Sequence, residues 1–437
     1  MPARPPIWLN SERFLARRLA RPVQRFLDIE ASGGLLLLLG TVVALVWANS
    51  PWSAVYRDLW HTELAVDVGG RIVAADLRHW VNDALMALFF FVVGLEIKQE
   101  LVSGHLARAR DAMLPAVAAL GGMVVPAAIY LAVNHRGGGG DGWGIPMATD
   151  IAFALGVLAL LGSRVPTQLK VLLLALAIVD DIGAIVVIAV FYSDEIHVRW
   201  ALAALAGLVL VALLRRLRVW YVPVYAVIGV AVWFATFESG IHATIAGVAL
   251  GLLTPARPLM PEHDAAAVAD ELSEDYEVTV TEVRAMSFRL RESVPVAERL
   301  QDLLHPWTSY VIIPLFALAN AGIELSCDVV RDAATSRVTI GVALGLLVGK
   351  LVGITGAVAL ATRLRLGTLP DGVTFGQVVG LSLLAGIGFT VSLFISGLAF
   401  SHPALEAQAK LGVLAVSVLA AVAGSVVLRA TLPRRTP

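Results

Sequence analysis

The sequence predicts an all-α polytopic membrane protein with about twelve transmembrane helices. Of its 437 residues, 58% are hydrophobic and only 15% carry a charge, which leaves more apolar surface than one water-soluble core can bury. The apolar residues occur in continuous runs of Leu, Val, Ala and Gly, whereas the strands of a membrane β-barrel alternate polar and apolar residues. Backbone polar groups inside a bilayer must pair within the chain, and continuous apolar runs achieve this as helices.

Twelve apolar runs are close to the roughly 20 residues that an α-helix needs to cross the hydrocarbon core. Each run ends at proline, glycine or charged residues. We expect the spans near residues 33–49, 78–101, 113–133, 142–161, 167–192, 198–215, 219–237, 240–254, 306–324, 338–362, 374–400 and 408–430. Between the first two, residues 62–76 alternate in polarity around Gly69 and Gly70, which is typical of a small β-hairpin in water.

The loop charges predict the orientation of the spans. Lys and Arg gather in the loops after spans 2, 4, 6 and 10, including Arg108, Lys170 and Arg363, and such an excess marks cytoplasmic loops. The basic N-terminal segment and the C-terminal arginines fall on the same side. Both termini are therefore expected in the cytoplasm and the hairpin in the periplasm, although Arg57 and Arg71 lie on the outer side against the rule.

These spans divide the chain into five parts. The Arg-rich start lacks the apolar core and cleavage site of a signal peptide, so the first span is expected to remain in the protein. The expected parts are a cytoplasmic segment 1–30, spans 1–8 with the hairpin in 31–255, a cytoplasmic linker 256–305, spans 9–12 in 306–430, and a cytoplasmic tail 431–437. The linker is interpreted as solvated with partial helix, and a regulatory element that senses pH or binds a partner is the alternative.

Net charge and cysteine content exclude some functions. The formal net charge of −1 gives no global attraction to nucleic acid, so no nucleic-acid partner is expected. Cys327 is the single cysteine, which excludes an internal disulfide and a cysteine metal cluster.

Two of the expected spans look broken rather than continuous. The fourth has Gly142, Gly144 and Pro146 before Asp150, and the eleventh has several glycines around Thr390. One broken span is the middle member of the triplet 3–5, and the other is the middle member of the triplet 10–12. The two triplets begin on opposite sides of the membrane. An inverted-topology repeat has this arrangement, and its broken helices cross near the midplane.

The fifth span places two carboxylates, Asp180 and Asp181, in the middle of an otherwise apolar helix. At roughly 2.5–3.5 kcal/mol for each central charge, the pair costs on the order of 5–7 kcal/mol, which requires partners or a task. Asp150 in the broken fourth span and Lys350 in the tenth add a third carboxylate and a cation at similar depth.

Three carboxylates and one lysine leave at least one carboxylate without a cation partner, so it must take a proton or bind a metal ion. Carboxylates, the Thr149 hydroxyl and unwound carbonyls suit Na⁺ or Li⁺ rather than zinc. Neighbouring helix residues point about 100° apart, so Asp180 and Asp181 are expected to differ, one facing the ion and the other reaching Lys350. Asp150 and Lys350 suit the ends of the half-helices. The alternative is a purely structural ion-pair network.

Other titratable residues lie near the ends of the spans. Glu96 and Glu100 share one helix face at the cytoplasmic end, either as interfacial anchors or as a funnel mouth that attracts cations. His242 lies near the outer surface, where a packing role is favoured over a catalytic one, and it is kept as a candidate for a pH response because histidine titrates near neutral pH.

Several segments resemble the NhaA sodium/proton antiporters of bacterial inner membranes. They include Ala31-Ser32-Gly33-Gly34, Asn82-Asp83-Ala84-Leu85-Met86, Val93-Gly94-Leu95-Glu96-Ile97-Lys98, Ala148-Thr149-Asp150-Ile151-Ala152-Phe153-Ala154-Leu155-Gly156, Ile178-Val179-Asp180-Asp181-Ile182-Gly183-Ala184 and Phe316-Ala317-Leu318-Ala319-Asn320-Ala321-Gly322. An inverted repeat is a known property of this family, so the agreement on the repeat is not independent. The resemblance implies that Asp181 binds the ion, Na⁺ or Li⁺, with Asp180 as its partner. It also implies that Lys350 pairs with Asp180, and that Thr149 and Asp150 lie at the helix crossing.

The resemblance further implies electrogenic, pH-regulated exchange of Na⁺ or Li⁺ for protons, without a cofactor. The protein would be a homodimer that pairs through its β-hairpins in the lipid of the bacterial inner membrane. The positions that the family associates with pH response are Glu96, Glu100, Arg299 and His305. Departures from the family pattern are Gln301 in place of a glutamate, and Glu298 and Gln99 in place of basic residues, so the pH profile is expected to differ.

Two other functions would also use carboxylates inside a membrane. An intramembrane aspartyl protease takes one aspartate from each of two helices to hold a water, whereas Asp180 and Asp181 are adjacent on one helix, so an enzyme is not expected. A sodium-coupled organic anion transporter on the same inverted-repeat scaffold is the remaining alternative.

Overall fold

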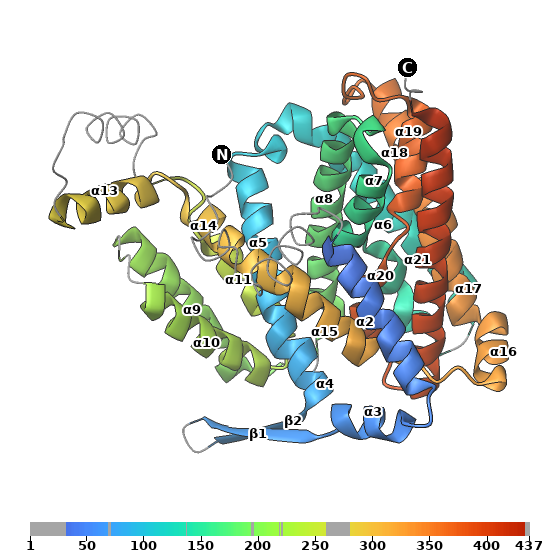
Figure 1. Ribbon diagram of the computed structural model, residues 1–437, viewed down its shortest axis with the longest axis horizontal. Helices are drawn as coiled ribbons and strands as arrows, with labels where there is room; N and C mark the ends of the chain where they lie inside the picture. Colours follow the sequence, from blue (N-terminus) through green and yellow to red (C-terminus); the bar gives the residue numbers. More distant parts are fainter. Residues whose placement is uncertain are drawn as a thin grey trace, which may run out of the picture.

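The computed structural model describes residues 32–432 apart from 69–70, 137, 194–195, 218, 220–221 and 259–279. The expected segment 1–30, the acidic part of the linker and the end of the tail lie outside the described residues. The described chain is a helical bundle with a two-stranded sheet at one end (Figure 1). We call that end the hairpin end, and the other the opposite end.

Seven helical segments among the described residues are long and apolar enough to cross a membrane. They are α4, η2 and α5 (Leu77–Trp80, Val81–Leu85, Met86–Val102), α6 (Ala109–Asn134), η4 and α7 (Gly140–Met147, Ile151–Leu160), α8 (Thr167–Phe191), α9 (Val198–Arg216), α17, η7 and α18 (Arg337–Leu344, Gly345–Gly349, Lys350–Arg363), and α21 (Pro403–Thr431). The chain is therefore a multi-pass membrane protein.

Two bent helix pairs raise the number of candidate spans to nine if each pair counts as one. They are α2 (Ser32–Ala48) with α3 (Ser53–Trp60), and α19 (Phe375–Leu384) with α20 (Phe389–Ala399), which are bent by 117° and 46°. Shorter apolar helices are α10 (Val222–Glu238) and α11 (Thr244–Leu253). The remaining elements are η3 (His105–Ala107), η5 (Gly162–Arg164), α13 (Val280–Glu292), α14 (Val296–Trp307), η6 (Thr308–Ile312), α15 (Ile313–Asn320) and α16 (Cys327–Thr335). Each of the twelve ranges expected from the sequence overlaps at least one described helix, and seven to nine of the described segments are long and apolar enough to cross a membrane.

Helix α14 begins at Val296, inside the stretch that the sequence suggested as linker. Its Ala297 is buried against Leu95 of α5 and Ala256, and the Ala297 N–H donates to the Pro255 carbonyl at 3.0 Å. Its apolar residues occupy one face of a largely polar helix, so no continuous apolar run marks its start.

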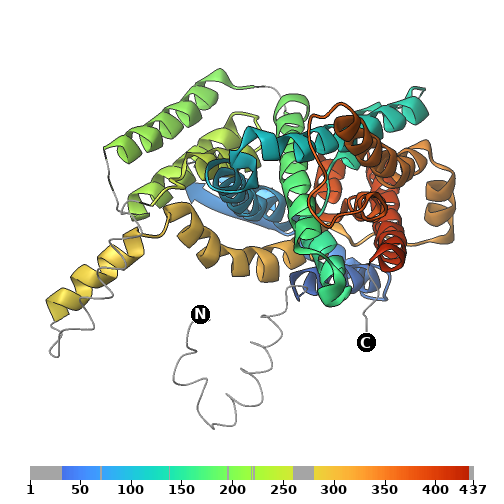
Figure 2. The same ribbon diagram turned by 90° about the horizontal axis from the view of Figure 1, so that it is seen from above.

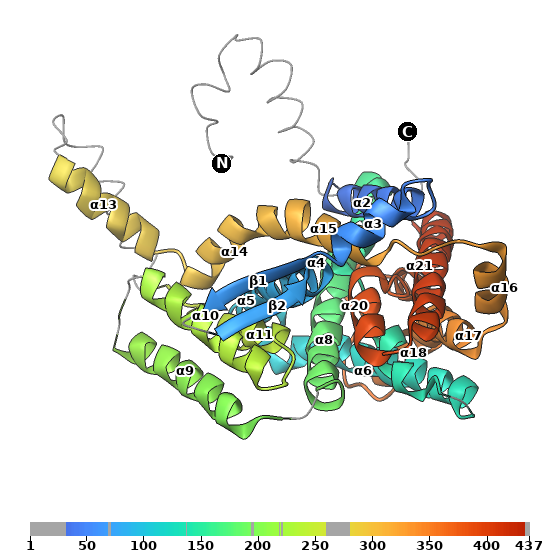
Figure 3. The ribbon, with the colours of Figure 1, turned by 90° about the horizontal axis from the view of Figure 1, so that it is seen from below.

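The segment expected to form a hairpin contains two antiparallel strands. Strand β1 (Glu63–Val68) pairs with β2 (Arg71–Asp76), with Glu63 opposite Asp76 and Val68 opposite Arg71. The glycine pair between them lies outside the described residues. The Trp80 indole N–H of α4 donates to the Leu64 carbonyl at 3.0 Å, which joins the sheet to the bundle. From the hairpin end, the strands extend across the side that holds α10 and α11 (Figure 3).

Helix α8 lies between two groups of helices. One group holds α5, α9, α10 and α11, and the other holds α17 to α21 (Figures 2 and 3). Helix α6 packs closely on α18 of the second group because Gly121 and Gly353 face each other. A Cβ added to Gly121 would lie 2.3 Å from the Gly353 carbonyl oxygen. Small residues allow such close approach of membrane helices. Asp180 and Asp181 lie near the middle of α8, and both are buried.

Candidate ion-binding site

The two broken helices meet at their breaks. Residues 148–150 separate η4 from α7, and residues 385–388 separate α19 from α20. The Asp150 N–H donates to the Ile387 carbonyl at 2.6 Å, which joins one break to the other. Each break leaves helix-end N–H and C=O groups without intrahelical partners. Other groups of the chain must therefore satisfy these ends within the bilayer.

Asp150 satisfies two helix N-termini at once. One carboxylate oxygen accepts from the Phe153 N–H at 2.9 Å and so caps α7. The other accepts from the N–H and the hydroxyl of Thr390 at 3.0 and 2.8 Å, at the start of α20. Helix N-termini carry partial positive charge, so the carboxylate lies where the sequence reasoning expected it. Thr390 was not assigned a role from sequence, although the glycines before it mark the break.

Lys350 lies at the other pair of helix ends. Its side chain is fully buried, forms an ion pair with Asp180, and donates to the Met147 carbonyl at 2.5 Å and to the Thr149 hydroxyl at 3.0 Å. Met147 is the last residue of η4, where a helix carries partial negative charge. The ammonium therefore compensates both a carboxylate and a helix C-terminus.

Thr149 links this ion pair to the second broken helix. Its hydroxyl lies 2.7 Å from the carboxylate of Asp180 and 3.0 Å from the carbonyl oxygen of Ala385, which follows α19. A hydroxyl has a single proton, so it donates to one of these acceptors at a time. Asp180 is fully buried, and its other carboxylate oxygen has no hydrogen-bond partner within the described residues. Asp180 is thus neutralised and held away from solvent.

Asp181 has a different environment from Asp180. Its side chain makes no hydrogen bond or ion pair with the described residues, and it lines a cavity of about 760 Å³ together with Thr149, Asp150 and Thr390. Asp180 is not among the lining residues. The divergence expected of adjacent helix residues is thus present: one carboxylate reaches Lys350 and the other faces the cavity.

The cavity extends from Asp181 to the end of α5 opposite the hairpin. Glu96, Glu100, Gln301 and His305 line it there. The Gln301 amide donates to Glu96 at 3.3 Å, and the Glu100 carboxylate accepts from the His105 N–H at 2.8 Å. Glu96, Glu100 and His305, for which the family resemblance implies a pH response, thus line the same cavity as Asp181.

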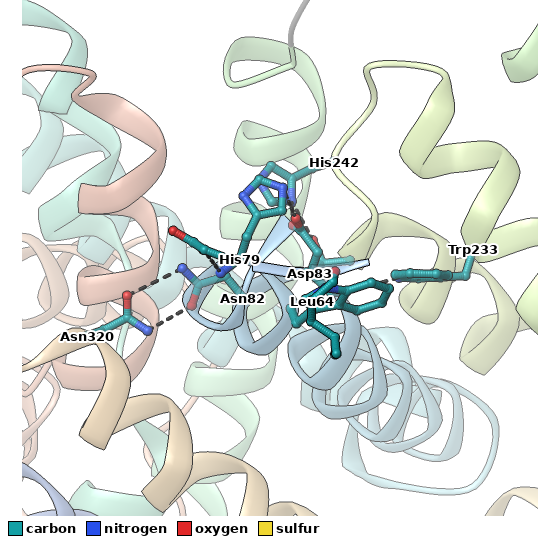
Figure 4. Close-up of polar contacts among 10 residues, drawn as sticks. Leu64, His79, Asn82, Asp83, Trp233, His242 and Asn320 are labelled. Carbon is teal, nitrogen blue, oxygen red and sulfur yellow. Dashed lines mark hydrogen bonds and ion pairs between the residues drawn. The ribbon is translucent and has the colours of Figure 1, made fainter. Parts of the chain in front are cut away.

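Arg299 and His242 do not line this cavity. Arg299 forms two hydrogen bonds with Glu292, at 3.0 and 3.3 Å. His242 lies at the hairpin end, where its ring contacts Phe394 and its Nδ1 is 3.8 Å from the Asp83 carboxylate (Figure 4). Its packing against Phe394 agrees with the plainer interpretation of this histidine.

The chemistry of the site suits a small hard cation. Among the described residues no group of three or more His, Cys, Asp or Glu side chains could hold a metal ion. Asp181, Asp150 and Thr149 line the same cavity, and carboxylate and hydroxyl oxygens are ligands that hard cations prefer.

Comparison with known proteins identifies the family. Residues 24–428 match the family model described as Na⁺/H⁺ antiporter 1. The chain is 47% identical to a protein named Na(+)/H(+) antiporter NhaA 2 from Sorangium cellulosum, over 98% of this chain and 94% of that protein. It is 47% identical to Na(+)/H(+) antiporter NhaA 3 from Frankia alni, over 96% and 90%.

A third relative, Na(+)/H(+) antiporter NhaA from Rhodopirellula baltica, is 48% identical over 96% of each chain. The proteins of this family are transporters rather than enzymes. The family model covers most of the chain, and the three relatives, all named NhaA, match it along nearly its full length. The chain therefore belongs to the Na⁺/H⁺ antiporter 1 family.

Proposed function

We propose that this protein exchanges Na⁺ or Li⁺ for protons across the bacterial inner membrane, with Asp181 as the carboxylate that both ions share. The observation that carries the proposal is the contrast between the two aspartates. Asp180 is buried and paired with Lys350, whereas Asp181 faces the cavity without a partner among the described residues. The names of the relatives support sodium and protons as the transported ions.

Competition at Asp181 accounts for exchange. The ionised carboxylate attracts a cation that enters through the cavity, and a proton on the same carboxylate removes that attraction. A bound Na⁺ and a bound proton therefore exclude each other. Electrogenic exchange, in which more protons than sodium ions move, requires a second protonatable group. The pair of Asp180 and Lys350 next to it is the candidate.

The proposed pH regulation acts at the mouth of the cavity. Glu96, Glu100 and His305 line the path of the entering cation, so their charge changes the local cation concentration. Arg299 lies on the same helix as His305, and its pairing with Glu292 holds the start of that helix in place. His242 lies at the hairpin end and would act on the outer side instead.

We infer twelve spans, with spans 3–5 and 10–12 related as an inverted repeat. The first triplet consists of α6, η4–α7 and α8, and the second consists of α17–α18, α19–α20 and α21. In each triplet the middle member is broken. The basic loops support a cytoplasmic location for both termini and for the linker 256–305. The hairpin 62–76 would then be periplasmic and join two copies as a homodimer.

A sodium-coupled organic anion transporter is the less favoured function. A cavity of about 760 Å³ is large enough for a small organic ion. However, Asp150, Asp181, Glu96 and Glu100 line it, and none of the described lining residues is Lys or Arg. An anion would meet repulsion there, whereas a cation would be attracted.

The proposal is tested by measuring the collapse of a pH gradient in everted membrane vesicles. We expect Na⁺ and Li⁺ to collapse the gradient at neutral and mildly alkaline pH. Well-expressed protein that leaves the gradient unchanged with every cation, but takes up an organic anion with Na⁺, would favour the alternative function.

A further inference from the structure

The half-helix η4 is held by hydroxyl groups from three other helices. The Tyr130 hydroxyl of α6 donates to the Gly139 carbonyl at 2.7 Å. The Tyr192 hydroxyl, directly after α8, donates to the Asp141 carbonyl at 2.6 Å and accepts from the Gly144 N–H at 3.2 Å. The Ser392 hydroxyl of α20 donates to the Ile145 carbonyl at 2.7 Å. We call Tyr130, Tyr192 and Ser392 the hydroxyl collar.

The two tyrosines fit the half-helix closely because glycines face them. A Cβ added to Gly142 would lie 2.4 Å from the Tyr130 hydroxyl, and one added to Gly144 would lie 2.8 Å from the Tyr192 hydroxyl. Real Cβ atoms do not approach so closely, so any other residue at these positions would displace the rings. The glycines that predicted a broken helix therefore also admit the collar.

The collar contacts the backbone directly before the ion-binding residues. The carbonyl held by Ser392 belongs to Ile145, two residues before Met147 and four before Thr149. The Met147 carbonyl accepts from Lys350, and the Thr149 hydroxyl lies between Lys350 and Asp180. A short 3₁₀ segment has weak internal hydrogen bonding, so its position depends on these external contacts.

Tyr192 donates its hydrogen bond at every pH at which the protein operates. A tyrosine hydroxyl has a pKa of about 10 in water, well above neutral pH. The hydroxyl therefore keeps its proton, and the contact to the Asp141 carbonyl does not vary with the titration of the transport site.

We propose that the hydroxyl collar is a set of positioning residues that determine sodium affinity by fixing η4, and with it Met147 and Thr149, against Lys350 and Asp180. This inference rests on the proposed exchange function and extends it to residues that do not contact the cavity. A collar that only stabilised the fold would affect the amount of folded protein, but not the affinity of the folded protein for sodium.

The test is Tyr192→Phe, which removes one hydroxyl and keeps the ring. The matched control is Tyr225→Phe, because the Tyr225 hydroxyl also donates to a backbone carbonyl, that of Val219 at 2.7 Å, but belongs to α10 in the other helix group. Ser392→Ala tests a second member of the collar with a smaller side-chain change. The measurements are the apparent KM and maximal rate for Na⁺ in everted vesicles, and the Na⁺-dependent rise in melting temperature of the purified variants.

One hydrogen bond of about 1 kcal/mol corresponds to a change of about five-fold in affinity. We expect Ser392→Ala, which loses one hydrogen bond, to raise the apparent KM for Na⁺ about five-fold. Tyr192→Phe loses two, so its KM should rise by at least about five-fold. Both variants should also weaken stabilisation by Na⁺, with Tyr225→Phe equal to wild type. The inference is overturned if the KM is unchanged in both collar variants, or if the control changes as much as they do. Exchange by the wild-type protein in the same assay would still support the proposed function. If wild type shows no exchange, the proposed function fails, and the Na⁺-dependent melting temperatures alone decide on the collar.

Discussion

Replacing Lys350 with methionine tests how far the buried ion pair stabilises the bundle. Lys350 and Asp180 are both fully buried, and their charged groups contact each other directly. Lys350→Met leaves the Asp180 carboxylate without its counter-charge. Removing one partner of a buried ion pair typically destabilises a protein by about 3–5 kcal/mol. The Met147 carbonyl also loses its donor, so we expect the loss to lie toward the upper end of that range.

The double variant Lys350→Met with Asp180→Asn separates the loss of charge from the loss of packing. It removes both charges, so no uncompensated charge remains buried, and it is the uncompensated charge that makes the loss of one partner so costly. We therefore expect it to recover most of the stability that Lys350→Met loses. Exchange activity would not recover, because the proposed site has lost a carboxylate.

Thermal unfolding in detergent, followed by tryptophan fluorescence, measures these differences. Lys410→Met is the matched control: Lys410 is a buried lysine of α21 that pairs with Glu406 at 2.6 Å, and the Glu406 side chain is 25% exposed. Water can solvate Glu406 after the substitution, so the loss should be smaller than for Lys350→Met. A Lys350→Met variant as stable as wild type, or a double variant no more stable than the single one, would refute the reasoning.

Two further variants test other contacts of the site. Asp150→Ala removes the cap of two helices and should destabilise the protein by about 0.5–2 kcal/mol for each cap, measured by the same unfolding assay, and a stability equal to wild type would contradict the capping role. Gln301→Glu replaces the amide that donates to Glu96 with a second carboxylate, and repulsion opposes ionisation of the introduced group. The onset of Na⁺-dependent exchange should then move to more alkaline pH in vesicles, and an unchanged onset would show that position 301 takes no part in the pH response.

Much of the helical arrangement follows from apolar runs and glycines. Long runs predict the positions of the spans because a helix is the simplest way to bury backbone groups in lipid. The glycines before Asp150 and around Thr390 predict the breaks. Helices such as α14 are harder to predict, because their apolar residues cover only one face and the chain around them is polar.

The contacts at the crossing could be predicted only in part. Charge balance indicates that one aspartate pairs with Lys350, and helix geometry indicates that the other points elsewhere, but residue chemistry alone leaves open which is which. Backbone carbonyls such as that of Met147 carry no sequence signal, since every residue has one. Lys410 lies at the edge of the expected span 408–430 and near the start of α21, where a charge is typical of the membrane interface, so its burial and its pairing with Glu406 could not be predicted.

The most direct test of the account is the exchange activity of Asp181→Asn. The control is Asp371→Asn, a substitution of the same type at an exposed carboxylate between α18 and α19. In everted vesicles we expect wild type and the control to collapse the pH gradient on addition of Na⁺ or Li⁺, and Asp181→Asn to leave it unchanged although the protein folds and reaches the membrane. Exchange by Asp181→Asn at the wild-type rate would contradict the assignment of this carboxylate as the site that sodium and protons share.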